Sequence, residues 1–443
     1  MPSCAHEPLP YQGPSREDVL DARQRYYNPA AFTYYDEPLM IVEGYMQYLF
    51  DETGRRYLDL IGGIATISCG HCHPKIVTKM KDQLSTLQHA TTIYLHPLQS
   101  ELAQRLAERM PPGLEVTYFV NSGSEANELA VNMARAYTGH TDVVAVRNAY
   151  HGTSSTSLGL TSLHTWKYPV PSGHFIHHAV CPDPYRSPFS GSPEEIAAKS
   201  AEDIRDLIRF STSGHVAAFI AEPIQGVGGV THGARNYLGL AFDVAREYGG
   251  LCIADEVQTG FGRTGDRFWG FESFDVVPDI VTTAKGIGNG APLAAVTTTP
   301  EIAEALTTRL HFNTYGGNPV SLAAGLGVLE VIDEEQLQEN ARVTGNQFKV
   351  GLQTLSERHR VIGDVRGMGL MLGIELVEDR VTKEPATAAA NAVMEYAKAE
   401  GVLLGRGGLF GNVLRIKPPL SVTADDVDFA LSVLENALTL NVP

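Results

Sequence analysis

The sequence predicts an α/β protein whose large central domain contains a mostly parallel sheet. From about residue 70 to residue 330, short apolar runs alternate with amphipathic helical patterns, an order typical of strand–helix–strand units. Helices are expected at Ala126–Tyr137 and Tyr237–Tyr248, each closed by a nearby glycine. At 443 residues the chain exceeds the usual size of a single hydrophobic core, which predicts a second, smaller domain. The apolar runs are Val116–Val120, Val143–Val146, Ala217–Ala221, Leu251–Ala254 and Ile280–Thr283.

The smaller domain is expected to be α+β and to use both ends of the chain. Near the N-terminus, Tyr45–Leu60 reads as a β-hairpin with its turn at Asp51–Gly54. A long helix at Leu322–Ile332 then leads from the central sheet toward the C-terminal elements. Those elements are a strand at Leu370–Val377, a helix near Ala388–Glu400, a strand at Val413–Ile416 and a final helix at Ala424–Leu438.

These elements divide the chain into three segments. We predict that residues 70–330 form the large, ligand-binding domain. Residues 1–69 and residues 331–443 are expected to meet in the small domain.

Charge and composition exclude several classes of partner. The chain has 34 basic and 51 acidic residues and a net charge of −17, which opposes binding to nucleic acid or to an anionic membrane. The five cysteines are irregularly spaced, as expected of free thiols in a reducing compartment. No apolar run reaches membrane-spanning length, and the first residues match neither a signal nor a transit peptide. We expect a cytoplasmic protein, although a mitochondrial matrix protein already trimmed of its transit peptide would look the same.

Two polar residues stand at the ends of apolar runs, where open α/β sheets bind ligands. Asp255 ends the run GLCIAD, and Lys285 follows DIVTTA. A lysine at the end of a buried strand is poorly hydrated, which lowers its pKa and favours the nucleophilic neutral amine. Taken alone, Lys285 could be a surface lysine, and Asp255 could cap a helix or pair with Arg263. The glycine-rich sequence KGIGNG leaves room for a planar ligand beside Lys285 and favours the functional interpretation.

The segment NSGSEANELA, residues 121–130, follows the apolar run VTYFV. Ser122 and Glu125 form an S-x-x-E capping box, which is a purely structural explanation. Glycine and serine at a helix start behind a strand also leave backbone N–H groups free for a phosphate. Beside Lys285 and Asp255, we favour the phosphate site.

Three further residues have both a functional and a structural interpretation. Tyr150 could stack on a planar ligand or could pack in the core. Arg415 alternates with Leu414 and Ile416, so it could face a cleft and bind a carboxylate, or it could lie on the surface. Glu222 opens the segment EPIQG.

The segment SCGHCHP, residues 68–74, superficially suggests a metal site. Zinc sites normally need a second ligand pair at matching spacing, and the sequence offers none. We therefore predict a turn here and no metal.

The motifs, taken in order, resemble those of the class III (omega) aminotransferases over nearly the whole chain, from about Tyr45 to Leu438. That resemblance implies the PLP-transferase fold type I. The motifs are GHCHP, NSGSEANE, YHG, EPIQG, IADEVQTGFGRTG, TAKGIGNG, FNTYGGNP, GDVRGMGLMLGIEL and LRIKPPL.

The resemblance implies the cofactor pyridoxal 5′-phosphate (PLP), held covalently on Lys285, which also transfers the proton. It implies that Asp255 pairs with the pyridine nitrogen and that Tyr150 stacks on the ring. The other cofactor-binding residues that it implies are Ser122, Gly123, Ser124, His151, Glu222, Val257, Gln258 and Thr314.

The resemblance also implies substrate contacts and an assembly. Arg415 would hold the substrate carboxylate, and Glu222 would mask that charge when a different amino donor enters. Thr314 is expected to reach the phosphate of a neighbouring subunit, which implies a homodimer or tetramer with shared active sites.

Within the family, GHCHPK, DIVTTAKGIGNG, HFNTYGGNP and GRGGLFGNVLRIKPPL look most like the type 2, mitochondrial alanine–glyoxylate branch, in its plant-like form. That branch implies transfer of an amino group from alanine or a β- or ω-amino acid to glyoxylate or pyruvate, by a ping-pong mechanism. The alternatives are a β-alanine– or 3-aminoisobutyrate–pyruvate transaminase, another omega-transaminase, a decarboxylase or lyase of the same fold, and a PLP-binding protein without turnover.

Overall fold

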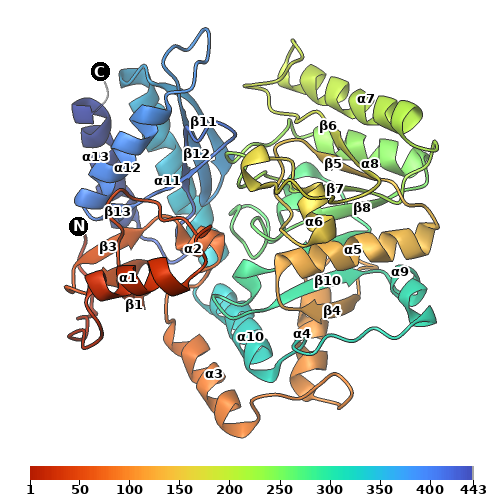
Figure 1. The fold of residues 1–443 in the computed structure, drawn as a ribbon, viewed down its shortest axis with the longest axis horizontal. Helices are drawn as coiled ribbons and strands as arrows, with labels where there is room; N and C mark the ends of the chain where they lie inside the picture. The colour runs from red at the N-terminus through yellow and green to blue at the C-terminus, as the bar shows by residue number, and fades with distance from the viewer. Residues whose placement is uncertain (442–443) are drawn as a thin grey trace.

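A seven-stranded sheet forms the centre of the protein in the computed structural model, which describes residues 1–441 (Figure 1). Its strand order is β4-β10-β9-β8-β7-β5-β6. The pairs from β9 to β6 are parallel, and β10 runs antiparallel to both of its neighbours. The predicted α/β class with a large, mostly parallel sheet is confirmed. The strands are β4 (Val116–Val120), β5 (Val143–Val146), β6 (Ile176–Ala179), β7 (Ala218–Ala221), β8 (Leu251–Asp255), β9 (Ile280–Thr283) and β10 (Ala294–Thr298).

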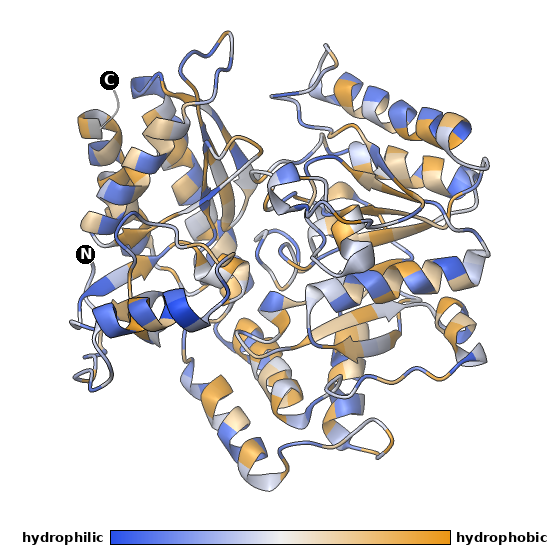
Figure 2. Ribbon diagram, in the orientation of Figure 1, coloured by the Kyte–Doolittle hydropathy of each residue, from blue (hydrophilic) through white to orange (hydrophobic). Residues whose placement is uncertain are grey.

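Both faces of this sheet are covered by helices, which explains why β5, β7 and β8 are apolar almost without interruption. Successive side chains of a strand point to opposite faces. Val143 and Ala145 of β5 pack in one cluster with α5 (Gly123–Thr138). Val144 and Val146 pack in another cluster with α7 (Pro193–Ser211) and α8 (Tyr237–Glu247). Figure 2 shows polar and apolar turns alternating along α7, as expected of a helix with one buried face.

Two four-stranded sheets lie beside the central one, with orders β1-β2-β3-β13 and β11-β12-β15-β14. The predicted hairpin is present as β2 and β3, with Tyr48 opposite Leu58. The last strand of this sheet comes from the other end of the sequence: Val402 of β13 pairs in parallel with Leu58. The strands are β1 (Ile41–Tyr45), β2 (Tyr48–Asp51), β3 (Arg56–Asp59), β11 (Ile362–Met368), β12 (Met371–Leu376), β13 (Val402–Leu403), β14 (Gly405–Gly407) and β15 (Val413–Ile416).

The remaining helices join and cover these sheets. The helix α10 packs on α3 and α4 and is buried along most of its length, whereas α1 buries none of its residues. No helix among residues 1–441 has both the length and the apolarity needed to cross a bilayer. The three segments proposed from the sequence remain a prediction. These helices are α1 (Arg16–Tyr26), α2 (Gly62–Ala65), α3 (Pro74–Thr86), α4 (Pro97–Ala107), α6 (Ser155–Leu160), α9 (Pro300–Glu304), α10 (Pro319–Glu334), α11 (Leu337–Arg358), α12 (Thr387–Ala399) and α13 (Ala424–Asn441).

Candidate active site

Three neighbouring parallel strands end at one edge of the central sheet and bring charged residues together there. Asp255 is the last residue of β8, Glu222 follows β7, and Lys285 lies just beyond β9. They face a cavity of about 170 Å³. Most of the residues expected from the sequence line this cavity, whereas Ser122, Thr314 and Arg415 do not. The lining residues are Gly123, Ser124, Asn127, Tyr150, His151, Gly152, Glu222, Asp255, Val257, Gln258 and Lys285.

Lys285 is half-buried and adopts a left-handed backbone conformation with φ of 49°. Burial lowers the pKa of its amine to about 8, although the carboxylates of Glu222 and Asp255 partly oppose the shift. An amine with this pKa is partly neutral at physiological pH, and a neutral amine is the form that attacks a carbonyl carbon.

Asp255 is held by three hydrogen bonds. Its Oδ2 accepts from Asn127 Nδ2 and contacts His151 Nδ1, both at 2.7 Å, and its Oδ1 accepts from the Val257 N–H at 3.1 Å. Asn127 is fixed in turn, because its Oδ1 accepts from Thr282 Oγ1 at 2.7 Å. The carboxylate is therefore locked in orientation while it remains at the cavity.

The alternative pairing of Asp255 with Arg263 is not formed. The Arg263 guanidinium instead donates to the carbonyl oxygens of Leu370 and Pro418 at 3.0 and 2.8 Å. Arg263 thus links the segment after β8 to the segments that contain Leu370 and Pro418.

The N-terminus of α5 is capped by Ser122 and also faces the cavity. Ser122 Oγ accepts from the Glu125 N–H at 3.2 Å, as the capping box predicts. The N–H groups of Gly123 and Ser124 have no acceptor within the helix, as at every helix start. A side chain at Gly123 would crowd Val257, because its Cβ would lie 3.2 Å from both valine methyl carbons. The backbone can therefore approach an anion here, which is the arrangement that favours a phosphate.

Glu222 is anchored by the backbone on both of its oxygens. Oε1 accepts from the Tyr150 N–H at 2.9 Å, and Oε2 accepts from the Gly226 N–H at 2.8 Å. Burial raises the pKa of this carboxyl group, and nearby His151 partly opposes the shift. The Tyr150 ring meets Trp166 edge-on, with ring centres 5.2 Å apart.

A lysine that we did not single out in the sequence lies behind Gln258. Lys417 Nζ donates to Gln258 Oε1 at 2.8 Å and to the Gly226 carbonyl oxygen at 3.2 Å. It is only 2% exposed, and burial, reinforced by Arg415, lowers the pKa of its amine well below the usual value. Within residues 1–441, Gln258 Nε2 has no hydrogen-bond partner, so its two N–H groups are available at the cavity.

Arg415 lines a second cavity, of about 290 Å³, next to the first. Its guanidinium donates to Tyr34 OH at 3.0 Å and to the Gly226 carbonyl oxygen at 3.3 Å. Its Nε has no hydrogen-bond partner in the part of the chain that the structure describes. The aromatic rings of Phe32 and Trp166 line the same space, together with a second arginine, Arg406.

Thr314 is exposed, and it lines neither cavity within one chain. It lies in the segment between α9 and α10, beside exposed Phe312 and Tyr315. Its expected role depends on a neighbouring subunit and remains a prediction.

Two residues at the site carried a signal in the sequence that we did not use. Asn127 interrupts the buried apolar stripe of α5, where a polar residue needs a specific partner. Lys417 stands two positions after Arg415, the spacing that places two side chains on one face of a strand.

The side chains of residues 68–74 have separate partners. His71 Nε2 contacts Asp59 Oδ2 and His73 Nε2 contacts Glu335 Oε1, both at 2.8 Å. Cys69 is buried, and Cys72 is exposed. In residues 1–441, no three His, Cys, Asp or Glu side chains lie close enough together to hold a metal ion.

Known proteins resemble this chain along almost its whole length. The chain is 53% identical to an Arabidopsis thaliana protein named alanine–glyoxylate aminotransferase 2 homolog 2, mitochondrial, over 99% of this chain and 91% of the relative. Among solved structures, an Arthrobacter phospholyase in complex with phosphoethanolamine superposes with a TM-score of 0.90 at 34% identity, covering 96% of this chain and all of the other. An amine transaminase from an uncultivated Pseudomonas species, in its PLP-bound form, superposes with a TM-score of 0.87 at 33% identity, covering 94% and 99% of the two chains.

The family model named aminotransferase class-III matches residues 32–438. That range includes every residue of the cavity at the carboxyl ends of β7, β8 and β9. The chain therefore belongs to the class III aminotransferase family.

Proposed function

We propose that this protein is a PLP-dependent aminotransferase that moves an amino group from alanine, or from a β- or ω-amino acid, to glyoxylate or pyruvate. One observation carries the proposal. The buried amine of Lys285 and the buried carboxylate of Asp255 face the same cavity from the ends of neighbouring strands. The relative named alanine–glyoxylate aminotransferase 2 homolog 2 supports the choice of substrates.

The residues of the cavity fit PLP at each of its functional groups. Lys285 supplies an amine for the aldehyde, and Asp255 supplies a fixed carboxylate for the pyridine nitrogen. The close packing of Gly123 on Val257 leaves bare backbone N–H groups at the start of α5 for the phosphate. The free N–H groups of Gln258 suit the ring oxygen.

When bound, PLP supplies an electron-accepting ring that stabilises negative charge on the substrate carbon. Asp255 keeps the ring nitrogen protonated, which strengthens that effect. With PLP bound, the amine of Lys285 would accept the proton from the donor Cα and later return it. Arg415 would bind the substrate carboxylate. Glu222 and Arg415 both hydrogen-bond to the backbone of Gly226, so Glu222 would compensate that positive charge when a substrate lacks a carboxylate there.

We further propose a homodimer or tetramer in which Thr314 completes the neighbouring subunit's phosphate site. The segment that carries Thr314 exposes Leu310, Phe312 and Tyr315, and exposed apolar side chains of this kind mark association surfaces. Light scattering after size exclusion measures the assembly. Mixing a Lys285→Ala protein with a Thr314→Ala protein tests for shared sites, because in mixed dimers one site then carries both changes and the other carries neither.

The central test is a panel of amino donors and acceptors. Alanine, β-alanine, 3-aminoisobutyrate, ornithine and 4-aminobutyrate are each combined with glyoxylate, pyruvate and 2-oxoglutarate, and the amino-acid products are quantified. Lys285→Ala should abolish turnover, whereas Lys81→Ala, a change at an exposed lysine, should not. Normal turnover by the Lys285→Ala protein would contradict the proposal.

The similarity to a phospholyase makes a lyase of the same fold the second candidate. Which bond breaks depends on how the substrate is oriented over the cofactor. Adding phosphoethanolamine to the panel separates the two candidates, because a lyase releases inorganic phosphate whereas a transaminase makes a new amino acid.

The word mitochondrial in the relative's name favours the mitochondrial alternative over the cytoplasmic expectation. Subcellular fractionation of the native protein, with matrix and cytosolic marker enzymes, decides between them.

A further inference from the structure

A separate cavity of about 460 Å³ lies between loops of the central sheet and the sheet β11-β12-β15-β14. It shares no lining residue with the cavity of Lys285 and Asp255. It shares Gly408, Leu409 and Phe410 with the cavity of Arg415, so the turn between β14 and β15 borders both. Its volume falls in the range of about 300–1000 Å³ that is typical of small-molecule sites.

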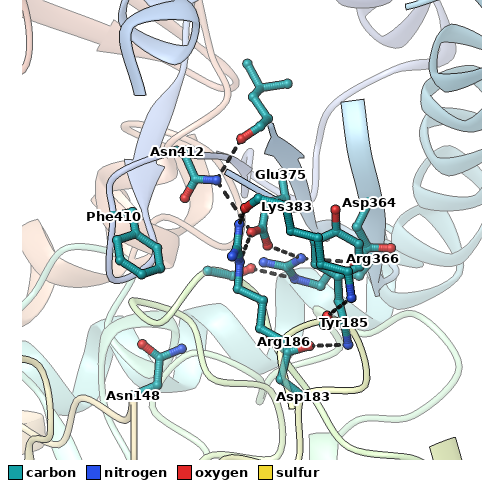
Figure 3. Close-up of polar contacts among 12 residues, drawn as sticks. Asn148, Asp183, Tyr185, Arg186, Asp364, Arg366, Glu375, Lys383, Phe410 and Asn412 are labelled. Carbon is teal, nitrogen blue, oxygen red and sulfur yellow. Dashed lines mark hydrogen bonds and ion pairs between the residues drawn. The ribbon is translucent and has the colours of Figure 1, made fainter. Parts of the chain in front are cut away.

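One part of the wall is a network whose charges cancel (Figure 3). Glu375 lies between two arginines: its Oε2 is 2.6 Å from Arg366 Nη1, and its Oε1 accepts from Arg186 Nε. Arg366 also pairs with Asp364 at 2.9 Å. Two arginines and two carboxylates therefore neutralise one another and leave the network without a free charge for a ligand.

A second part of the wall carries a carboxyl group outside that network and two hydrogen-bond acceptors without partners. Asp183 is 7% exposed and forms no ion pair in residues 1–441; its Oδ1 accepts only from the Tyr185 N–H at 2.8 Å. Burial raises the pKa of its carboxyl group, and the nearby Arg366 partly opposes the shift. Asn148 Oδ1 and Thr231 Oγ1 are buried and have no hydrogen-bond partner in that range. Thr231 is only 1% exposed. A buried polar atom without a partner is destabilising, so the two acceptors favour a ligand that donates hydrogen bonds, and the Asp183 carboxyl group favours one that carries positive charge.

A third part of the wall carries the opposite charge. Arg147 lines the cavity with an exposed side chain, and no acidic group of residues 1–441 lies within ion-pair distance of it. Its only hydrogen bond there runs from Nε to the His178 carbonyl oxygen at 3.3 Å. Its terminal N–H groups are therefore free to bind a carboxylate.

We propose that this cavity is a second, non-catalytic site that binds a free amino acid with an apolar side chain. The ammonium group pairs with Asp183 and donates to Asn148 and Thr231, and the carboxylate pairs with Arg147. The apolar side chain packs on Leu409 and its neighbours in the turn. Because that turn also borders the Arg415 cavity, the bound amino acid lies against a wall of the proposed substrate site.

The test measures binding of leucine to the full-length protein by calorimetry and by saturation-transfer NMR. The protein is first loaded with PLP and reduced with borohydride, so that amino acids no longer react. Leucine should bind, whereas 4-methyl-2-oxopentanoate, which lacks the ammonium group, and isoamylamine, which lacks the carboxylate, should each bind at least about ten-fold more weakly. A protein that takes up no PLP would contradict the proposed function, but leucine binding can still be measured on it.

Three variants locate the bound leucine. Asp183→Asn should weaken binding about ten- to one hundred-fold and Thr231→Val about two- to ten-fold. Thr231→Val replaces a buried, unpaired hydroxyl by a methyl group of similar size, so its unfolding midpoint should match or exceed that of the wild type. Arg415→Gln should leave leucine affinity unchanged. The proposal is overturned if no leucine binds at millimolar concentration, if Asp183→Asn and Thr231→Val bind normally, or if Arg415→Gln is the variant that loses binding.

Discussion

Lys417 and Gln258 form a buried pair in which the lysine fixes the orientation of the amide. Because an amine at Lys417 donates to Gln258 Oε1 at 2.8 Å, the Nε2 group of Gln258 is turned toward the cavity. The packing is close, since a Cβ on Gly226 would lie 2.4 Å from the same Oε1. No carboxylate in residues 1–441 pairs with Lys417, so the amine is kept at a cost in stability.

Replacement of Lys417 by methionine should therefore separate PLP affinity from stability. Without its partner the Gln258 amide can rotate, and PLP affinity should fall about five- to ten-fold, the equivalent of one hydrogen bond. The protein without PLP should be as stable as the wild type or more stable, because an unpaired buried amine is removed. Spectrophotometric titration with PLP measures the first effect and urea unfolding the second. In a Gln258→Leu background the same change should add nothing to the loss of affinity; additive losses would mean that the two residues act independently.

The pKa of about 8 at Lys285 predicts a distinctive pH dependence. Its amine should react with aldehydes half-maximally near pH 8, whereas exposed lysines need a pH near 10.5. Methylation with ¹³C-formaldehyde and cyanoborohydride, followed by NMR from pH 6 to 10, measures this in the PLP-free protein. A Lys285 signal that titrates with the bulk lysines would contradict the burial effect.

The same shift makes Lys285 a stability cost at neutral pH. Between pH 8 and 10.5 the unfolded chain keeps the proton that the folded chain has lost, so folding stability rises with pH across that window. Lys285→Met should therefore be more stable than wild type at pH 7, by up to about 3 kcal/mol. The gap should narrow as the pH is raised toward 10. Urea unfolding of both PLP-free proteins at several pH values supplies the comparison.

Substitution of Gly152 should displace the first turn of α5. Gly152 has φ of 120°, and a Cβ there would lie 2.2 Å from Ser124 Oγ and 2.9 Å from Ser124 Cα. Gly152→Ala should displace Ser124 and lower PLP affinity at least about ten-fold, besides costing on the order of 1–3 kcal/mol of stability. Gly113→Ala is the matched control, because Gly113 has φ of 97° but nothing within 4 Å of the added Cβ. Equal PLP affinity in the two variants would argue against a role for Ser124.

Asn127 should matter for both the fold and PLP. Asn127→Ala removes the 2.7 Å bond to Asp255 and leaves Thr282 Oγ1 without its acceptor, so unfolding stability should fall by about 1–3 kcal/mol. PLP affinity should fall as well, because Asp255 loses one of its three fixed contacts. Asn340→Ala provides a comparison: it removes bonds to the Leu420 and Val422 carbonyl oxygens, and none of these three residues lines either cavity. It should lower stability without changing PLP affinity.

The sequence was most informative where chemistry coincides with a strand end. Asp255 and Lys285 could be placed together because parallel strands end at the same edge of a sheet, and the structure has both at one cavity. The strands that carry them could be predicted equally well, because strands buried on both faces appear in the sequence as continuous apolar runs. The edge strand β6, with the sequence IHHA, and the alanine–threonine strand β10 lack such runs and were not predicted.

Long-range polar contacts could not be predicted from the sequence. Ser122 and Glu125 reveal their capping box locally, but the partner of Asn127 is Asp255, a residue on another element. Likewise, nothing local to Lys417 indicates that it meets Gln258. Such contacts depend on how distant segments pack, and that information lies in the tertiary arrangement.

The parallel pairing of β13 with β3 has a consequence for the newly made protein. Leu58 is translated well before its partner Val402, because the whole central sheet lies between them in the sequence. The hairpin β2–β3 must wait, with an open edge, while the whole central sheet is made and folds. The outer edge of β3 therefore stays unpaired while the residues between the two strands are synthesised, and premature termination before β13 leaves that edge exposed.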